Sequence, residues 1–406
     1  MRTPGTVTLH ARNAVALVFA VNGFAFATWV SRIPEARDAL GLTPGQLGTL
    51  LIAGSVGAVL ALPTTGMWVH RFGAARVVAA AAVIDALGLA LAGAGAGAAT
   101  VVWLTAVGLF LLGFGSGAWD VAMNVEGAAV EHELARTIMP RFHAAFSLGT
   151  VVGAGVGALA AWGGLSVAVH LVLSSVLVAV SAVVAVRWFL SRGVEEVAEE
   201  DAGGRRHPFR AWAEPRTLAI GLMVLAMALT EGVANDWLAV ALVDGYDVAP
   251  WVGASGFALF VAAMTLGRVT GTGVLDRFGR VPVLWSCMAL AAVGVLLVVL
   301  GDQPLVVAAG IVLWGVGASL GFPVGMSAAA DDPEHAAARV SVVSTIGYTA
   351  FLAGPPVLGY LGDHVGVLHA LLLVAVLLVP SALAVPAARE RVRSRDVAGT
   401  PGRSAG

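Results

Sequence analysis

The feature that most constrains this chain is the way its arginines are distributed along a series of long apolar segments. All 23 basic residues are Arg, because the chain contains no Lys. When the apolar segments are threaded back and forth through a membrane, twenty Arg of the 23 fall on one side. Only Arg32 and Arg37 fall on the other side, and Arg268 lies inside a segment. Positively charged loops stay in the cytoplasm, so the pattern predicts that both termini are cytoplasmic.

The composition restricts the classes of protein to which the chain can belong. It is 58% hydrophobic and only 12% charged, whereas a soluble domain carries about twice that charge. We therefore expect a membrane protein that lies in the lipid bilayer and crosses it many times. With a net charge of −2 the chain has no excess of positive charge with which to bind nucleic acid. It has a single cysteine, Cys287, so a disulfide within the chain is excluded. A Walker A loop needs a Lys that contacts the phosphates of ATP, so a chain without Lys has no such loop. We expect neither a cofactor nor a metal.

Twelve segments are long and apolar enough to span a bilayer, which takes about 20 residues of helix. They begin near Asn13, Gly45, Arg76, Thr100, Arg141, Ser166, Thr217, Pro250, Val281, Pro304, Val340 and Gly366. Alternating ten-residue strands are absent, so we predict an all-α membrane protein of twelve transmembrane helices. In the fifth segment Gly149, Gly153 and Gly157 predict close approach of a neighbouring helix.

One charge-dense stretch, residues 191–216, interrupts the apolar pattern and divides the chain. We expect a six-helix bundle over residues 1–190, a cytoplasmic linker over 191–216 and a second bundle over 217–388. The Arg-rich residues 389–406 are predicted to be a disordered tail. The halves resemble each other, since HRFG at 70–73 corresponds to DRFG at 276–279. A six-plus-six repeat is typical of transporters with a site between two rocking halves.

The repeated loop resembles the signature of the major facilitator superfamily, G-x-x-x-D-R-x-G-R-R. Its first copy runs from Gly66 to Arg76 and its second from Gly271 to Arg280, with His70 in place of the acidic residue in the first copy. Other pieces, such as Trp29 to Leu42 and Glu231 to Trp237, resemble bacterial inner-membrane permeases related to the fucose-permease type. The resemblance implies two pseudo-symmetric bundles with a cavity lined by the first, fourth, seventh and tenth spans.

In this superfamily the signature loop closes the cytoplasmic face through charge pairs. The residues that the resemblance assigns to such a latch are His70, Arg71, Arg76, Asp276, Arg277 and Arg280, together with Asp120 as an acceptor. The resemblance also implies a location in the bacterial cytoplasmic membrane.

Polar residues inside the predicted spans are the candidates for chemistry, because an ionisable group within a bilayer is costly unless it is paired or wet. In the first span Asn22, Phe26 and Trp29 share one helix face and could bind a solute, or form a helix contact and an interfacial anchor. In the fourth span Asp120 and Asn124 share a face, and Asn124 is a candidate solute ligand. Asp120 could bind a proton or serve the latch, and we favour the latch.

The seventh span has the densest polar cluster, and we assign proton coupling to it. Glu231 is the first choice for the proton and Asp236 the second, with Asn235 and Trp237 as solute ligands. The alternative is that Glu231 forms a salt bridge with Arg268 or Arg32. In the tenth span Trp314 is a further candidate solute ligand.

Together these features predict a monomeric secondary active transporter that moves a small organic solute by alternating access, driven by protons. Aromatic walls and few charges suggest a neutral or weakly polar solute, and export of a drug or metabolite is the alternative to uptake. A membrane-embedded enzyme lacks a catalytic constellation in this sequence. A solute sensor that transports nothing would need a soluble output domain, which the sequence does not show.

Overall fold

The computed structural model describes residues 5–134, 136, 138–190, 208–332 and 335–390, and every regular element in these ranges is helical. The first half comprises α1 (Thr6–Val30), α2 (Ile33–Leu40), α3 (Pro44–Phe72), α4 (Ala74–Ala94), η1 (Gly95–Ala99), α5 (Val102–Leu134), α6 (Met139–Trp162), α7 (Val167–Ala185) and η2 (Val186–Trp188). The second comprises η4 (Pro208–Ala213), α8 (Pro215–Tyr246), α9 (Pro250–Phe278), α10 (Arg280–Leu300), α11 (Pro304–Ala318), α12 (Gly321–Ala329), α13 (Ala336–Val365), α14 (Val367–Ala370), α15 (Leu372–Ala382) and η5 (Val385–Ala388). Most of the predicted linker and tail, 191–207 and 391–406, lies outside the described residues.

Eleven helices in the described part of the chain are long and apolar enough to cross a membrane, with α11 and α12 counted together as Pro304–Ala329. The twelfth predicted segment is the shorter Val367–Ala382, interrupted at Leu371. At 1.5 Å per residue it reaches about 24 Å, slightly less than the hydrocarbon core. The fold is therefore the all-α membrane architecture that the sequence predicts, with a short last span.

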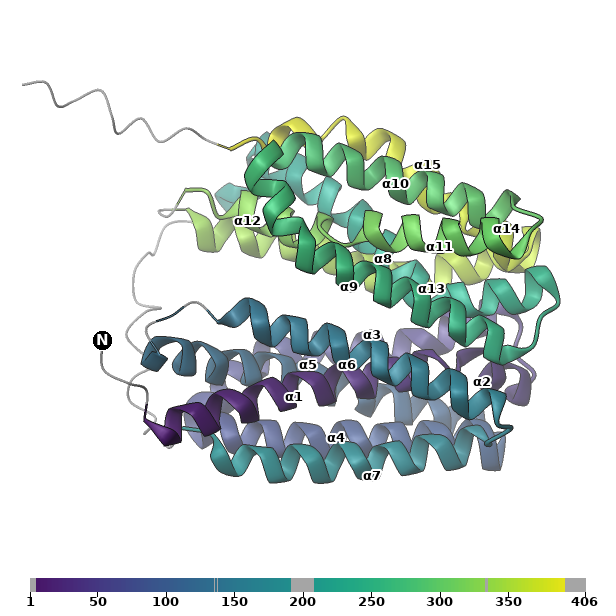
Figure 1. The fold of residues 1–406 in the computed structure, drawn as a ribbon, viewed down its shortest axis with the longest axis horizontal. Coiled ribbons are helices and arrows are strands. Elements are labelled where there is room, and N and C mark those ends of the chain that lie inside the picture. The colour runs from purple at the N-terminus through teal and green to yellow at the C-terminus, as the bar shows by residue number, and fades with distance from the viewer. Residues whose placement is uncertain (1–4, 135, 137, 191–207, 333–334, 391–406) are drawn as a thin grey trace, which may run out of the picture.

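The helices form two bundles that lie side by side along the whole length of the molecule (Figure 1). In this view α1 to α7 form the lower bundle and α8 to α15 the upper one. We call the end where α1 and α8 begin the terminus end, and the opposite end, which carries α2, the α2 end. The main contacts between the bundles are made by α6 with α9 and by α3 with α13, and α2 also contacts α8 and α9.

Close glycine contacts hold α1 against α6 within the first bundle. A Cβ atom added to Gly149 would collide with the backbone carbonyl of Ala20, and one added to Gly153 would collide with that of Phe24. The glycine spacing in the sequence therefore predicts this contact correctly. Gly155, on the same helix, has no atom of another segment near its absent Cβ.

This difference gives a test of the packing. We expect Gly149→Val to lower the melting temperature of the purified protein, because inserted carbon atoms at a close helix contact cost about 1–3 kcal/mol. The matched variant Gly155→Val should unfold within a degree or two of the wild type. Equal melting temperatures for the two variants would contradict the close approach of α1 and α6.

Candidate functional site

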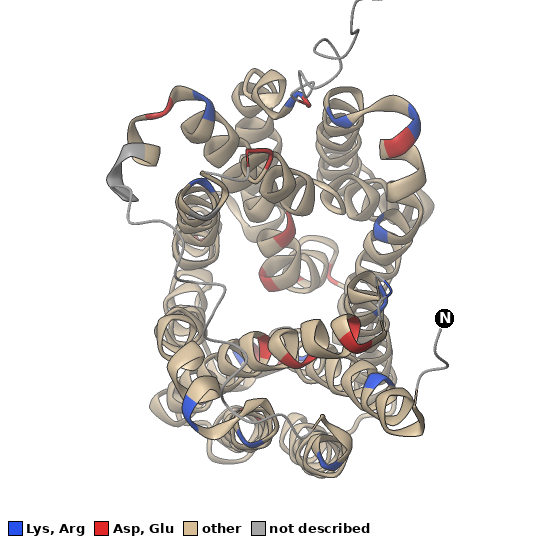
Figure 2. Cartoon of the chain, turned by 90° about the vertical axis from the view of Figure 1, so that its left-hand side faces the viewer, with Lys and Arg blue, Asp and Glu red and all other residues tan. Residues whose placement is uncertain are grey.

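A cavity of about 350 Å³ lies between the two bundles, midway along the helices. Its walls come from both halves of the chain: α1, α3, α4, α5 and α6 on one side, α8 and α13 on the other. The lining positions fall near the middle of most of these helices, for example Asn22 in α1 and Asp236 in α8. Figure 2, which looks onto the terminus end, shows several acidic segments bordering the central space, with most Arg segments farther out.

Three carboxyl groups line this cavity: Asp85 from α4, Asp120 from α5 and Asp236 from α8. Asp120 is exposed to the cavity and accepts a hydrogen bond from Asn124. Asp236 is partly buried and has no partner among the described residues. Asp85 is only 1% exposed, and its Oδ2 has no hydrogen-bond partner. The acidic groups therefore face a shared space without a basic partner.

Two amide residues that line the same cavity have buried polar atoms without a hydrogen-bond partner. Asn22 of α1 is 3% exposed and its Nδ2 donor is unused, while Asn235 of α8 is 8% exposed and its Oδ1 acceptor is unused. Buried polar groups normally have hydrogen-bond partners, so several unused ones in a single cavity point to a site that binds something.

Aromatic side chains contribute to the remaining wall, together with a larger number of aliphatic residues and glycines. Phe26 and Trp29 come from α1, Phe146 from α6, and Tyr348 and Phe351 from α13. Among the described residues that line the cavity there is no Arg and no His. The charged side chains of the described lining are thus all acidic, and they lie in a largely apolar wall that includes rings from both bundles.

Asp85 reaches the cavity because α4 and α5 pack unusually closely. A Cβ atom on Gly115 of α5 would collide with the backbone of Asp85, and one on Gly108 would collide with Ala92. Small residues at such a contact bring the two backbones together. Sequence reasoning singled out Asp85 only as an acid without an evident partner, since its position on the cavity wall depends on this packing.

The cavity includes six of the ten residues to which the sequence assigns solute or proton binding: Asn22, Phe26, Trp29, Asp120, Asn235 and Asp236. Asn124 lies one turn beyond Asp120 and donates to its backbone carbonyl. Trp237 and Trp314 are completely buried inside the second bundle, away from the cavity. The indole of Trp314 donates to the carbonyl of Thr230 and packs edge-on against Phe260.

Glu231 lies outside the cavity wall and forms an ion pair with Arg268 of α9. The Arg268 Nη2 atom lies 3.0 Å from each carboxylate oxygen. The Nε of Arg268 donates to the carbonyl of Ser319, where the tenth span breaks between α11 and α12. A cation at the carboxyl end of a helix is favourable, so Arg268 stabilises the break while it neutralises Glu231. Arg32, the other suggested partner, pairs instead with Glu35.

At the α2 end, polar contacts join the two bundles. Arg37 of α2 forms an ion pair with Asp244 of α8 and a second one with its neighbour Asp38. Asp363 of α13 accepts a hydrogen bond from the backbone amide of Gly45, at the start of α3. In the sequence, Arg37 stands out as one of two Arg residues on its side of the membrane. The sequence does not identify Asp244 as its partner.

At the terminus end, the ion pairs between described residues stay within one bundle. Arg280 of the second signature loop pairs with Asp331, which also pairs with Arg216. Arg339 donates to Glu214 and lowers the pKa of that carboxyl.

The other predicted latch residues do not form the expected pairs in this structure. Arg71 and Arg277 lie over the rings of Phe72 and Phe278, the residues that follow them. His70, Arg76 and Asp276 are exposed, and Asp120 receives no Arg from the first signature loop.

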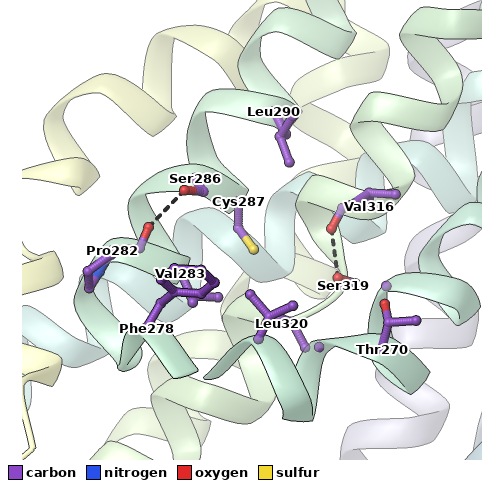
Figure 3. Close-up of a pocket in the computed structure, with 13 residues that line it drawn as sticks. Thr270, Phe278, Pro282, Val283, Ser286, Cys287, Leu290, Val316, Ser319 and Leu320 are labelled. Carbon is purple, nitrogen blue, oxygen red and sulfur yellow. Dashed lines mark hydrogen bonds between the residues drawn. The ribbon is translucent and has the colours of Figure 1, made fainter. Parts of the chain in front are cut away.

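A second cavity, between α9, α10 and α11, is a weaker candidate (Figure 3). Its wall is mostly apolar, and it includes Cys287 and Leu320. The hydroxyls of Ser286 and Ser319 donate to the carbonyls of Pro282 and Val316, so they leave little to bind a ligand. No group of three or more His, Cys, Asp or Glu suited to a metal occurs in the described part of the chain.

Known proteins resemble this chain in sequence and in structure. Residues 15–274 and 252–405 match the sequence profile of the Major Facilitator Superfamily. An uncharacterised MFS-type transporter of Yersinia pestis is 31% identical over 350 residues, which cover 86% of this chain and 88% of that protein.

Two solved transporter structures share the fold at lower sequence identity. A mutant form of the nucleoside transporter NupG superposes with a TM-score of 0.76 at 16% identity, covering 94% of this chain and 100% of NupG. A variant of the Escherichia coli fucose:proton symporter FucP superposes with a TM-score of 0.62 at 16% identity, covering 94% and 98%. With matches over nearly its whole length, this chain belongs to the Major Facilitator Superfamily and is a membrane transporter, not an enzyme.

Proposed function

We propose that the protein is a secondary active transporter that moves a small organic solute by alternating access and draws energy from a proton gradient. The observation that carries the proposal is the cavity between the bundles, with the unpartnered groups of Asn22, Asp85 and Asn235 at its wall. A site at the interface of two repeats can be exposed to either side when the repeats rock.

The arginine distribution supports an orientation with the terminus end in the cytoplasm. In that orientation the contacts of Arg37 and Asp363 hold the bundles together on the outer side. Between described residues, no ion pair joins the bundles on the inner side. This arrangement corresponds to a state that is closed outward.

Opening the outer side requires the bundles to separate at α2 and α8. The guanidinium of Arg37 would lose both oxygens of Asp244, and the start of α3 would lose Asp363. A hydrogen bond to a charged group contributes about 1.5–3 kcal/mol, so these contacts bias the equilibrium without locking it. Closing the inner side would bring together surfaces that now face the cytoplasm.

Proton coupling is assigned to Asp236 together with Asp120. A carboxylate without a partner in a membrane interior is costly, and binding a proton removes that cost. Glu231 was the first choice from the sequence, but Arg268 already neutralises it. The titratable groups facing the cavity with these two acids are Asp85 and Tyr348. His143 of α6 lies near Arg268, outside the wall. The E. coli fucose:proton symporter, which shares this fold, is named as a proton symporter, and this likeness supports the assignment.

The outer contact can be tested with Asp244→Asn, which removes the charge that Arg37 binds across the bundles. We expect the population opened at the α2 end to rise by about tenfold or more, since the contact contributes at least about 1.5 kcal/mol. Distances between spin labels placed on α2 and on the α8–α9 turn would report the change.

The matched control is Asp38→Asn, because Asp38 binds the same guanidinium from the same bundle. It should leave the label distances near those of the wild type. If Asp244→Asn and Asp38→Asn gave the same distance distribution as the wild type, Arg37 would have no part in closing the outer side.

Proton coupling can be tested in proteoliposomes with Asp236→Asn. We expect this variant to lose accumulation driven by a pH gradient while it keeps exchange of solute at equal pH, because exchange needs no net proton movement. Glu231→Gln should retain the driven component if it folds, and Asp302→Asn, at an exposed site outside the cavity, is the control. Full pH-driven accumulation by Asp236→Asn would refute its role.

A further inference from the structure

We infer that the cavity selects solutes that carry a protonated amine; this inference rests on the proposed transport function and names its substrate class. It differs from the neutral or weakly polar solute that the sequence suggests, because Asp85 joins Asp120 and Asp236 on the cavity wall. Three properties of the wall favour a cation of this kind: its charge, its unused hydrogen-bonding atoms and its aromatic rings.

The charge of the wall is the first property. Asp85, Asp120 and Asp236 come from three different helices and from both bundles, and the described lining residues include no Arg or His to balance them. An anionic solute in this space would meet only like charge, whereas an ammonium group would supply the missing counter-charge. Arg268 of α9, which lies inside a span, is already paired with Glu231.

The unused hydrogen-bonding atoms are the second property. Asp85 is only 1% exposed, and its Oδ2 is an unused acceptor on the first bundle. Asn235 offers an unused acceptor on the second bundle, and Asn22 offers an unused donor. An ammonium group has three donors and no acceptor, so it matches a wall that is rich in acceptors. The unused amide nitrogen of Asn22, which carries two N–H donors, fits a hydroxyl or carbonyl oxygen elsewhere on the solute.

The aromatic rings are the third property. Phe26 and Trp29 on one wall and Tyr348 and Phe351 on the other line the same space as the carboxyl groups. A desolvated ammonium group gains about 2 kcal/mol over an aromatic face, whereas an anion is repelled by it. The cavity volume of about 350 Å³ suits a solute of one or two rings.

The position of the acids also explains how such a solute could be sensed by both bundles. Asp85 and Asp120 belong to the first bundle and Asp236 to the second. A cation bound between them contacts both moving parts at once. It could therefore remain bound while the bundles rock, as alternating access requires.

The inference can be tested with sets of compounds that share a skeleton and differ in one group. The amines are 2-phenylethylamine, cyclohexylamine and glucosamine. Each is matched by an alcohol or sugar (2-phenylethanol, cyclohexanol, glucose) and by a carboxylate (3-phenylpropionate, cyclohexanecarboxylate, glucuronate). The full-length protein in detergent is melted with each compound at millimolar concentration, because a ligand that binds the folded state raises the melting temperature.

We expect at least one amine to raise the melting temperature while its alcohol or sugar and its carboxylate do not. Asp120→Asn and Asp236→Asn should each weaken the apparent affinity for that amine about tenfold or more, and Asp302→Asn should leave it unchanged. Asp85→Asn is used only if it melts like the wild type without ligand, because this residue is buried. The inference is overturned if no amine stabilises the protein, or if a neutral or acidic partner does so equally well.

Exchange of a radiolabelled amine in proteoliposomes separates this inference from the proposed transport function. Stabilisation by an amine without any exchange would contradict transport and leave the amine site standing. Exchange of a neutral or anionic compound, with no preference for its amine, would contradict the amine site and leave transport standing.

Discussion

The structure depends on one electrostatic constraint: a carboxyl group in the interior of a membrane protein needs a counter-charge, a proton or water. Glu231 meets this need with Arg268, which also binds the free carbonyl at the break in the tenth span. Asp85, Asp120 and Asp236 meet it only through the cavity that they share. The same kind of group is thus structural in one place and available for binding in the other, and the difference lies in whether a basic partner is present.

The contacts between the bundles are distributed in a way that suits movement. The described ion pair that crosses between them is Arg37 with Asp244, at the α2 end, and a carboxylate of α13 binds the start of α3 nearby. Helices approach at glycine positions within the first bundle, such as Gly149 and Gly115, and also between the bundles, where Gly48 of α3 lies against the backbone of Pro355 in α13. The packing inside a bundle favours its movement as a rigid body, and the polar contacts at the α2 end must break when the outer side opens.

Much of this arrangement could be predicted from the sequence. The length of each apolar segment matches the thickness of the bilayer, and the positions of the arginines follow its cytoplasmic side. Helix periodicity also placed Asn22, Phe26 and Trp29 together on the cavity wall. The same reasoning failed for Trp237 and Trp314, which are buried inside the second bundle. A helical position gives a direction only relative to its own helix, and the facing partner decides whether that direction is a cavity or a core.

Other features required the three-dimensional structure. No pattern of residues near Asp85 in the sequence predicts that it lies on the cavity wall. It reaches the cavity because Gly115 lets α4 approach α5 closely. The partner of Arg37 lies 207 positions away in the chain, beyond the reach of local pattern. The signature loops identified the family, but the predicted pairing of Asp120 with their arginines is absent in this state, where Asp120 faces the cavity.

The central claim is that one cavity is exposed alternately to the two sides of the membrane. The most direct measurement is labelling of Ser116→Cys, on the cavity wall, after the native Cys287 has been replaced by Ser. A membrane-impermeant thiol reagent is applied from one side or the other to oriented vesicles. We predict that the cysteine reacts from both sides and that Asp244→Asn raises the rate from the side of α2. The claim would be contradicted if the cysteine at position 116 reacted from one side only, both with Asp244 intact and with Asp244→Asn.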